Sequence, residues 1–370
     1  MFYLTLFALT TILFYFAQKS YERSRIMFYV LSYAAILLIA FVAGARDESI
    51  GTDVRVYGIS TFERAQKAEN FGDDVEVFGW IDSGYYAINY LAASLGGGLG
   101  AALFLQSLIM TTLVFNGMKT YMATAPLWLT MLLYNLYFYS PTLNMMRQGI
   151  AMAILLWSLR FFEARQFKKF LVCAVVCFFF HKTSVLAYLT MFAIYWVAGK
   201  DEQAQKKYLL WAAIASATVV ALLGAIMAYL ATLSSELDRF NAYTSGFFEP
   251  SVSTLDVLFR GGAIAAILWL SSKGVVFSSR KYIACLVLII DLAMQFLGLY
   301  SFYATRMSYY FFACAIPMIV SVLSESRLSK GSLTIVKTCL VAFFCYYCIR
   351  FYYVDGNNET YPYSSELLGF

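Results

Sequence analysis

The sequence predicts an all-α membrane protein with several transmembrane helices, and three observations lead to this. Of the 370 residues, 61% are hydrophobic and 13% are charged, whereas a soluble protein is about 45–50% apolar and about 25% charged. Long apolar runs recur along the whole chain. Lipid offers no hydrogen-bond partner to backbone groups, so runs of this kind span as helices. A soluble enzyme is therefore excluded.

The apolar runs place the predicted helices in order. A span needs about 20 apolar residues, so the chain has room for about 12 helices, within a range of about 10 to about 13. The first run is apolar from its start and has no basic segment before it, so we expect an anchor rather than a cleaved signal peptide. The predicted spans lie near 2–17, 26–44, 99–117, 121–139, 148–163, 167–180, 183–198, 208–231, 256–271, 282–299, 306–323 and 334–351.

The charges between the runs predict the orientation. If the loop after the first span is cytoplasmic and the spans alternate, the cytoplasmic segments hold 17 of the 27 basic residues and five of the 22 acidic ones. This bias follows the positive-inside rule. It also explains the net charge of +5, so the charge does not indicate nucleic-acid binding. Among the charged residues, only Asp291 lies deep in a predicted span.

The alternation requires that the stretch near 80–95 does not cross the membrane. We expect a re-entrant or interfacial helix there, on the outer side. It belongs to an outer segment, 45–98, which includes the longest polar loop of the chain. The prediction is a single integral membrane domain, 1–370, with 45–98 as a periplasmic loop.

Several cations fall on the outer side, where the bias disfavours them. Arginine carries a planar fork of five donors that suits a diphosphate, and converging arginines bind a diphosphate without a metal. The alternative for each is snorkelling to the headgroups. The single histidine excludes a histidine-rich metal site, and we expect neither a metal nor a cofactor. These cations, with the histidine, are Arg46, Arg147, His181, Lys182, Arg260 and Arg306.

Acidic and aromatic residues accompany these cations. A carboxylate in the outer loop is a candidate to accept a proton from a sugar hydroxyl, although a solvated acidic loop explains most of them. Aromatic faces stack on sugars, although an interfacial aromatic belt explains many of these positions. The acidic candidates are Asp47, Asp53 and Glu76, and the aromatic ones include Tyr57, Tyr85, Tyr300 and Tyr309.

At these residues the sequence resembles the EpsG/Wzy-type bacterial polysaccharide polymerases. Arg46, the Gly51-Thr52-Asp53 triplet and Tyr57 resemble the family's opening motif. Later elements follow in the family's order, and Lys182 departs from the small or polar residue expected at its position. These elements are Glu76 with Gly79 and Tyr85, Arg147-Gln148 with Ala151, Phe180-His181 with Thr183 and Ser184, and Arg306 with Tyr309 and Tyr310.

The resemblance implies a lipid-sugar glycosyltransferase of GT-C-like fold in the bacterial inner membrane. Its site would face the periplasm and join repeat units carried on undecaprenyl diphosphate, with no metal. Membrane lipids and a chain-length regulator protein are the further partners that it implies.

The resemblance and the residue types together give each residue an expected role. Arg147 and Arg306, with Arg46 or Arg260, would stabilise the diphosphate leaving group. His181 would donate a hydrogen bond to the diphosphate or act as base, and Asp47, Asp53 or Glu76 would orient or deprotonate the acceptor hydroxyl. The expected sugar contacts are Gly51, Thr52, Asp53, Tyr57, Tyr85, Asn144, Gln148, Tyr300 and Tyr309.

Two other functions remain open at this point. A lipid-linked oligosaccharide flippase or other transporter would carry charges near the membrane midplane, whereas most charges here gather at one edge. An O-antigen ligase uses similar donors and differs in its acceptor.

Overall fold

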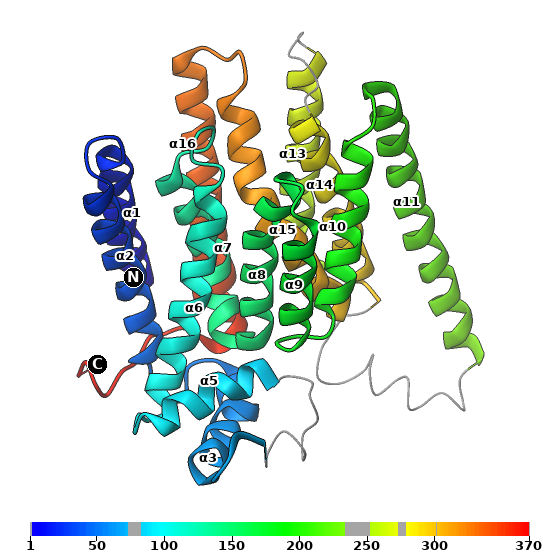
Figure 1. Ribbon diagram of the computed structural model, residues 1–370. Coiled ribbons are helices and arrows are strands. Elements are labelled where there is room, and N and C mark those ends of the chain that lie inside the picture. Colours follow the sequence, from blue (N-terminus) through cyan, green and yellow to red (C-terminus); the bar gives the residue numbers. More distant parts are fainter. Residues whose placement is uncertain (1, 73–82, 234–251, 273–278, 301, 370) are drawn as a thin grey trace. The chain divides into compact units, whose positions relative to one another are not determined.

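The computed structural model describes residues 2–72, 83–233, 252–272, 279–300 and 302–369, and the chain folds there into helices without a strand. It divides into two units, residues 1–185 with 328–370 and residues 186–327. We call these unit 1 and unit 2 and describe each by itself. Every predicted apolar run coincides with a helix (Figure 1).

Unit 1 contains most of the predicted spans. Helices α2, α7 and α8 all pack against α6. Helix α1 packs against α2 and α7, α9 packs against α8, and α16 packs against α7. The bounds are α1 Phe2–Ser20, α2 Arg25–Gly44, α6 Leu99–Lys119, α7 Leu127–Asn144, α8 Met146–Glu163, α9 Phe167–Phe178 and α16 Lys330–Tyr347.

Local sequence explains where several of these helices begin and how closely they pack. The Ser24 hydroxyl accepts a hydrogen bond from the Met27 amide and caps α2. Pro126 precedes α7, where a missing N–H costs nothing. Gly44 and Gly100 let α2 and α6 touch through their backbones, because a Cβ on Gly44 would lie 2.6 Å from the Cβ of Phe104.

Unit 2 consists of α11 Glu202–Leu233, α13 Thr254–Ser272, α14 Ser279–Leu297 and α15 Phe302–Ser324, and α10 Ser184–Ala198 begins at the boundary. Helix α14 packs against α11, α13 and α15. Unit 2 therefore has a core of its own around α14.

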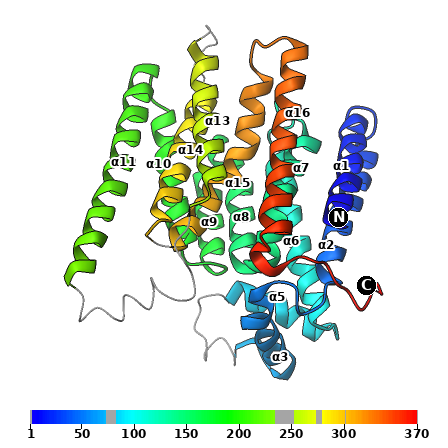
Figure 2. The same cartoon turned by 180° about the vertical axis from the view of Figure 1, so that it is seen from behind.

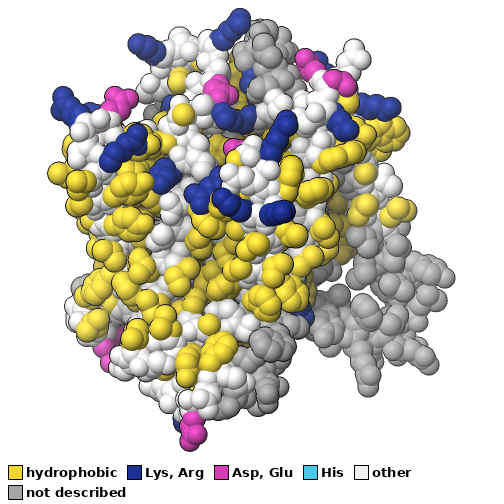
Figure 3. Space-filling model, viewed as in Figure 1, with side chains coloured by type: hydrophobic (Ala, Val, Ile, Leu, Met, Phe, Trp, Pro, Cys, Tyr) yellow, Lys and Arg dark blue, Asp and Glu magenta, His cyan; other side chains and the backbone are white. Residues whose placement is uncertain are grey.

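Five of the described helical segments are long and apolar enough to cross a membrane: α1, α2, α6, α15, and α16 continued to Val354. Their surfaces are apolar as well, with large side chains such as Ile12, Phe16, Ile26 and Val30 exposed. Figure 3 shows broad hydrophobic areas on the surface of the molecule. Exposed apolar surface of this kind is suited to lipid. The chain is a membrane protein.

The segment expected to be a polar loop after α2 is largely helical in its described part. It forms a π-helical turn, η1 Val54–Gly58, followed by α3 Ile59–Lys67. Phe62 and Ala65, three residues apart, lie buried on one face of α3, and this face forms part of the packing of α3 against α5 and α6. The expectation of a loop was therefore wrong for residues 54–67, where apolar residues spaced for one helix face let a polar segment pack as a helix.

Helix α5, Ser83–Ser94, corresponds to the stretch expected to be re-entrant or interfacial. Its 12 residues span about 18 Å at a helical rise of 1.5 Å per residue, short of the ~30 Å hydrocarbon core. It packs against α3 and α6. Figure 1 shows α3 and α5 together beyond one end of the unit 1 helices. Helix α9 also has 12 residues and coincides with a predicted span, so length alone does not decide, and the non-crossing of this stretch stays a prediction.

The chain ends in a tail that returns to the same end of unit 1. A second π-helical segment, η2 Cys348–Val354, leads into a short turn, η3 Asn357–Glu359. The tail then runs past the end of α2 toward the N-terminal helices (Figure 2). We call this end of unit 1, made of residues 45–72, 83–98, 143–147 and 355–369, the loop end.

Candidate functional site

The turn between α7 and α8 forms the centre of the loop end. Only Met145 separates the two helices, and its amide donates to the Pro141 carbonyl over 2.7 Å. The turn brings Asn144 to the end of α7 and Arg147 to the first turn of α8. Arg147 therefore lies among backbone N–H groups that have no partner within the helix, which adds to the positive potential there.

Arg46, two residues after the end of α2, contacts this turn. Its Nη2 donates to the Leu143 carbonyl over 2.9 Å and lies 3.7 Å from the Met146 Sδ. The last carbonyls of a helix have no intrahelical donor. Arg46 therefore supplies one to α7 directly before the turn that carries Arg147.

The Gly51-Thr52-Asp53 triplet lies against the same turn. Gly51 has a φ of +92°, and a Cβ there would lie 3.0 Å from the Leu143 carbonyl oxygen, so glycine fits both the backbone and the space. The Asp53 amide donates to the Asn144 Oδ1 over 2.8 Å. The triplet is thereby fixed to the α7–α8 turn, with Thr52 between the two contacts.

Tyr57 joins the acidic and the basic members of the motif. Its hydroxyl donates to the Asp53 Oδ2 over 2.9 Å. The Arg147 guanidinium carbon lies 4.2 Å from the centre of its ring, a cation–π contact. The ring also meets Tyr85 edge to face at 5.6 Å. Burial, and then the Asp53 carboxylate, raise the pKa of Tyr57 well above its ordinary value, so it stays a donor.

Arg46 is buried without an acidic partner. It is 6% exposed, and in the described part of the chain no carboxylate pairs with it and its Nε makes no hydrogen bond. Burial lowers the pKa of its guanidinium. It lines a cavity of about 10 Å³ with Gln106 and Ser107, whose buried polar side-chain atoms also lack described hydrogen-bond partners. A space of that size admits about one water molecule.

The turn that carries His181 is docked onto α5. The Gly84 amide donates to the Phe179 carbonyl over 3.0 Å, and a Cβ on Gly84 would lie 2.9 Å from the Phe180 ring. His181 itself is half-buried and its amide donates to the Cys177 carbonyl. Because Tyr85 follows Gly84, α5 connects the His181 turn to the Tyr57 ring.

The Asp47 carboxylate anchors the C-terminal tail. Its Oδ1 accepts the Glu366 amide over 2.8 Å, and its own amide donates to the Ser364 carbonyl. The Gly51 amide donates to the Glu359 carbonyl over 3.0 Å. The sequence analysis missed this tail, because no local pattern shows that residues so far apart in the chain meet. Any catalytic role of Asp47 remains a prediction.

In unit 2, Arg260 lies fully buried between two carboxylates. Its Nε donates to the Asp291 Oδ2 over 2.5 Å, and its Nη1 pairs with Asp256 one turn earlier in α13. Its guanidinium carbon also lies 4.2 Å from the centre of the Phe312 ring. Both carboxylates would have to yield before Arg260 bound a diphosphate, so that role also remains a prediction.

Arg306 and Tyr309 lie one turn apart near the start of α15. Tyr309 interacts electrostatically with Arg306, and with the Arg260 cluster. The Gln295 side chain, on α14, donates to the Ser308 hydroxyl over 2.7 Å. Tyr300 lies in the turn after α14. Of the predicted residues of unit 2, Arg260, Arg306 and Tyr309 thus lie near one another, and no contact of Tyr300 with Tyr309 is seen among the described residues.

Most of the residues that the sequence predicts for the site lie together in unit 1. Unit 1 gathers Arg46, Gly51, Asp53, Tyr57, Tyr85, Asn144 and Arg147 at the loop end, and Gln148 is buried beside Arg147 in α8. Glu76 lies outside the described residues. The catalytic and binding roles of all these residues stay predictions.

Comparison with known proteins bears on the same residues. No curated protein and no solved structure matches the chain. The family described as the EpsG family matches residues 29–365, which include every motif at the loop end as well as Arg260 and Arg306. The chain belongs to the EpsG family, a family of Wzy-type polysaccharide polymerases.

Proposed function

We propose that the protein joins polyprenyl-diphosphate-linked oligosaccharide repeat units into an O-antigen or capsular polysaccharide, by glycosyl transfer at the periplasmic face of a bacterial inner membrane. In this proposal about 12 predicted spans cross the membrane in a GT-C-like arrangement. Family membership supports the reaction class. The charge bias of the loops supports the orientation, because the loop end lies on the side with fewer basic residues.

The observation that carries the proposal is the placement of Arg147. Its guanidinium lies on the Tyr57 ring at the first turn of α8, and Arg46 caps the helix just before it. Stacking holds the guanidinium plane, so its donors are oriented before a ligand arrives. Arg147, Arg46 and the N-terminus of α8 then all supply positive charge at one place. This charge suits a diphosphate.

The proposed reaction needs this charge when the leaving group forms. A hydroxyl oxygen of the acceptor unit attacks the anomeric carbon of the donor glycan. The bond from that carbon to the diphosphate oxygen breaks, and the diphosphate leaves with the electron pair. Arg147, with Arg46, stabilises the negative charge that develops on this oxygen. The roles of Arg260 and Arg306 in diphosphate binding stay predictions from the sequence.

The acceptor proton goes to a carboxylate in the proposal. Asp53 is held by the Asn144 side chain and the Tyr57 hydroxyl, so its second oxygen has a fixed direction. Asp47 and Glu76 are the other predicted candidates. His181, on the turn docked against α5, is proposed to donate a hydrogen bond to the diphosphate. Tyr57 and Tyr85 would contact the sugars.

The test replaces Arg147 in cells and compares polymer length. Arg147→Ala should abolish long chains while lipid-linked single units accumulate, because loss of one oriented donor costs about 10²–10³-fold in rate. Arg147→Lys keeps the charge but loses the planar fork, so we expect short chains only. Arg55→Ala is the matched control, because Arg55 also lies at the loop end but forms a solvent-exposed ion pair with Glu359.

The same gel separates the alternatives. A ligase or a flippase variant gives uncapped lipopolysaccharide core, and a flippase variant also retains its lipid-linked units on the cytoplasmic side. Undiminished chain length in Arg147→Ala, with protein amount equal to wild type, would contradict the proposed function.

A further inference from the structure

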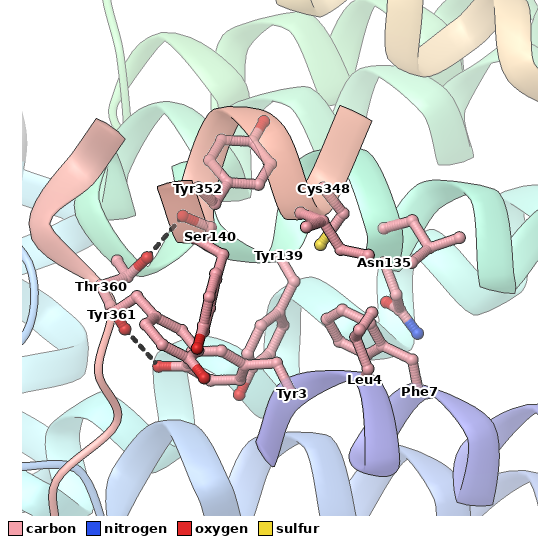
Figure 4. A pocket seen from close by; sticks show the side chains of 13 residues that line it. Tyr3, Leu4, Phe7, Asn135, Tyr139, Ser140, Cys348, Tyr352, Thr360 and Tyr361 are labelled. Carbon is pink, nitrogen blue, oxygen red and sulfur yellow. Dashed lines mark hydrogen bonds between the residues drawn. The ribbon is translucent and has the colours of Figure 1, made fainter. Parts of the chain in front are cut away.

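A pocket of about 260 Å³ lies in unit 1 between α1, α7, η2 and the C-terminal tail. Figure 4 shows its labelled side chains converging from these four elements. Apolar and aromatic side chains make up most of its wall, including Leu4 and Phe7 of α1, Leu136 and Tyr139 of α7, and Ile349 of η2. A concave apolar pocket with few polar groups is the usual form of a small-molecule or lipid site.

The hydroxyl groups of this wall are already used inside the protein. The Tyr3 hydroxyl donates to the Thr360 carbonyl over 2.9 Å, and the Ser140 and Thr360 hydroxyls bond to each other over 2.5 Å. The Tyr352 hydroxyl donates to the Tyr137 carbonyl over 2.6 Å. A sugar needs a partner for each of its hydroxyls. The donors of these hydroxyls are engaged within the protein and the rest of the wall is largely apolar, so the wall favours a hydrocarbon.

Asn135 is the exception on this wall. It is 4% exposed and lines the pocket (Figure 4). A sugar would need a polar group of this kind as a hydrogen-bond partner, whereas a hydrocarbon would not depend on it.

Two features connect the pocket with lipid on one side and with the arginines on the other. Helix α1, and α16 continued through η2, are both candidate membrane spans, and Ile349 on the pocket wall is 41% exposed. Arg46 donates to the carbonyl of Leu143, which lies four residues, or about one helical turn, after Tyr139 of the pocket wall on α7. A lipid whose chain lay in the pocket would therefore have its head group near Arg46.

We propose that this pocket binds a segment of the polyprenyl chain of a lipid-linked substrate. The inference rests on the proposed function for the identity of the lipid. At ~30 Å³ for a water-sized group, the pocket holds roughly nine such groups, or about two isoprene units. A methyl-branched, unsaturated chain fits this bulky aromatic wall better than a straight saturated chain does. The pocket would hold the chain while the diphosphate lies at Arg46.

The experiment measures binding without turnover. Purified full-length protein is labelled by light with a diazirine-bearing polyprenyl diphosphate, and the cross-linked peptides are identified by mass spectrometry. A phosphatidylethanolamine with a diazirine in its acyl chain is the second probe. We compare Leu4→Trp, which fills the pocket from α1, with Leu9→Trp, an exposed position on the same helix outside the pocket.

The expected result is labelling of pocket peptides by the polyprenyl probe, competed by unlabelled polyprenyl phosphate. Leu4→Trp should lower this labelling about tenfold, which corresponds to a loss of ~1.4 kcal/mol in binding, and Leu9→Trp should not change it. Asn135→Leu should keep the labelling, whereas a sugar site would lose it. Unfolding midpoints equal to wild type confirm that each variant is folded.

Three outcomes would overturn the inference: equal labelling of the pocket by the phospholipid probe, labelling unaffected by Leu4→Trp, or labelling lost in Asn135→Leu. The proposed function fails separately. If Arg147→Ala still makes long polymer, that function is wrong even where the pocket is labelled, and if the pocket is not labelled while Arg147→Ala blocks polymer, only the chain site is wrong.

Discussion

Arg46 in unit 1 and Arg260 in unit 2 are both buried, yet their charges are compensated in opposite ways. Arg260 is fully buried and paired with Asp256 and Asp291. Arg46 is 6% exposed and meets a backbone carbonyl, a sulfur atom and neighbouring tyrosines. The sequence predicted both arginines at the same depth. Arg260 is paired with two carboxylates, whereas Arg46 has no carboxylate partner among the described residues.

The difference separates a structural charge from one suited to a ligand. A buried ion pair adds little net stability, but removing one partner leaves an unpaired charge and is strongly destabilising. An uncompensated buried cation is itself costly, and an anionic ligand would relieve that cost. We therefore expect substitution at Arg260 to affect folding first, and substitution at Arg46 to affect activity first.

Arg260→Met should have the largest effect on stability. It leaves Asp256 and Asp291 buried without their cation, and breaking a buried pair costs about 3–5 kcal/mol. The free energy of unfolding in detergent, measured by denaturant titration, should fall by that amount. Adding Asp256→Asn and Asp291→Asn should restore most of it. A midpoint unchanged in Arg260→Met would show that the cluster does not hold unit 2 together.

Arg46→Met should leave stability nearly unchanged and remove activity. The loss of the bond to the Leu143 carbonyl costs about 1 kcal/mol, and removal of a buried uncompensated charge offsets it. Polymer formation should fall about 10²-fold, as for loss of an oriented donor. Both quantities are measured on the same purified protein. If Arg46→Met unfolds as readily as Arg260→Met, the contrast between the two arginines is wrong.

The sequence predicted the helices well because hydrophobicity is a local property. Each apolar run coincides with a helix, but the span predicted near 121–139 begins later, at Leu127, because Pro126 stands inside the predicted run. The pairing of Arg260 was only partly visible. Asp256 lies four residues before it, a spacing that places both on one helix face, but the contact with Asp291 depends on how α13 and α14 pack. The way in which two helices pack cannot be predicted from the sequence of either helix alone.

Tyr57 provides a smaller effect that distinguishes its two contacts. Tyr57→Phe removes the hydrogen bond to Asp53 and keeps the ring against Arg147, so we expect a loss of about fivefold in polymer formation, equivalent to ~1 kcal/mol. Tyr57→Ala also removes the ring contact and should lose more. Equal activity of Tyr57→Phe and Tyr57→Ala would show that the ring does not orient Arg147.

The raised pKa of Tyr57 gives a pH dependence with a definite sign. Its pKa lies above its ordinary value of 10.0 in the folded protein, so between pH 10 and the higher folded value the folded state binds more protons. Stability from this group is fully present below pH 10 and is lost as pH rises through the folded pKa. Unfolding midpoints of wild type should therefore fall more steeply above pH 10 than those of Tyr57→Phe.

The loop end shows what the sequence did not predict. The motif residues were identified from their order, but the contacts that arrange them come from remote segments: Leu143 for Arg46, Asn144 for Asp53, and the C-terminal tail for Asp47 and Gly51. The positive φ of Gly51 follows from its position against Leu143. The sequence shows the chemical type of each residue, but it does not show which distant residue that residue contacts in the folded protein.

Arg55→Ala should have the smallest effect of all. Arg55 pairs with Glu359, and their side chains are 51% and 56% exposed, so water and salt screen the charges and the pair is worth less than about 1 kcal/mol. The Gly51 amide bonds to the Glu359 carbonyl rather than to its carboxylate, so the tail stays attached when the pair is lost. Glu359→Ala should match Arg55→Ala in unfolding midpoint and in polymer length, and the small difference from wild type should vanish in high salt. A large loss of polymer in Arg55→Ala with stability intact would mean that exposure does not separate the arginines of the loop end, and that Arg55 belongs with Arg147 in binding the diphosphate.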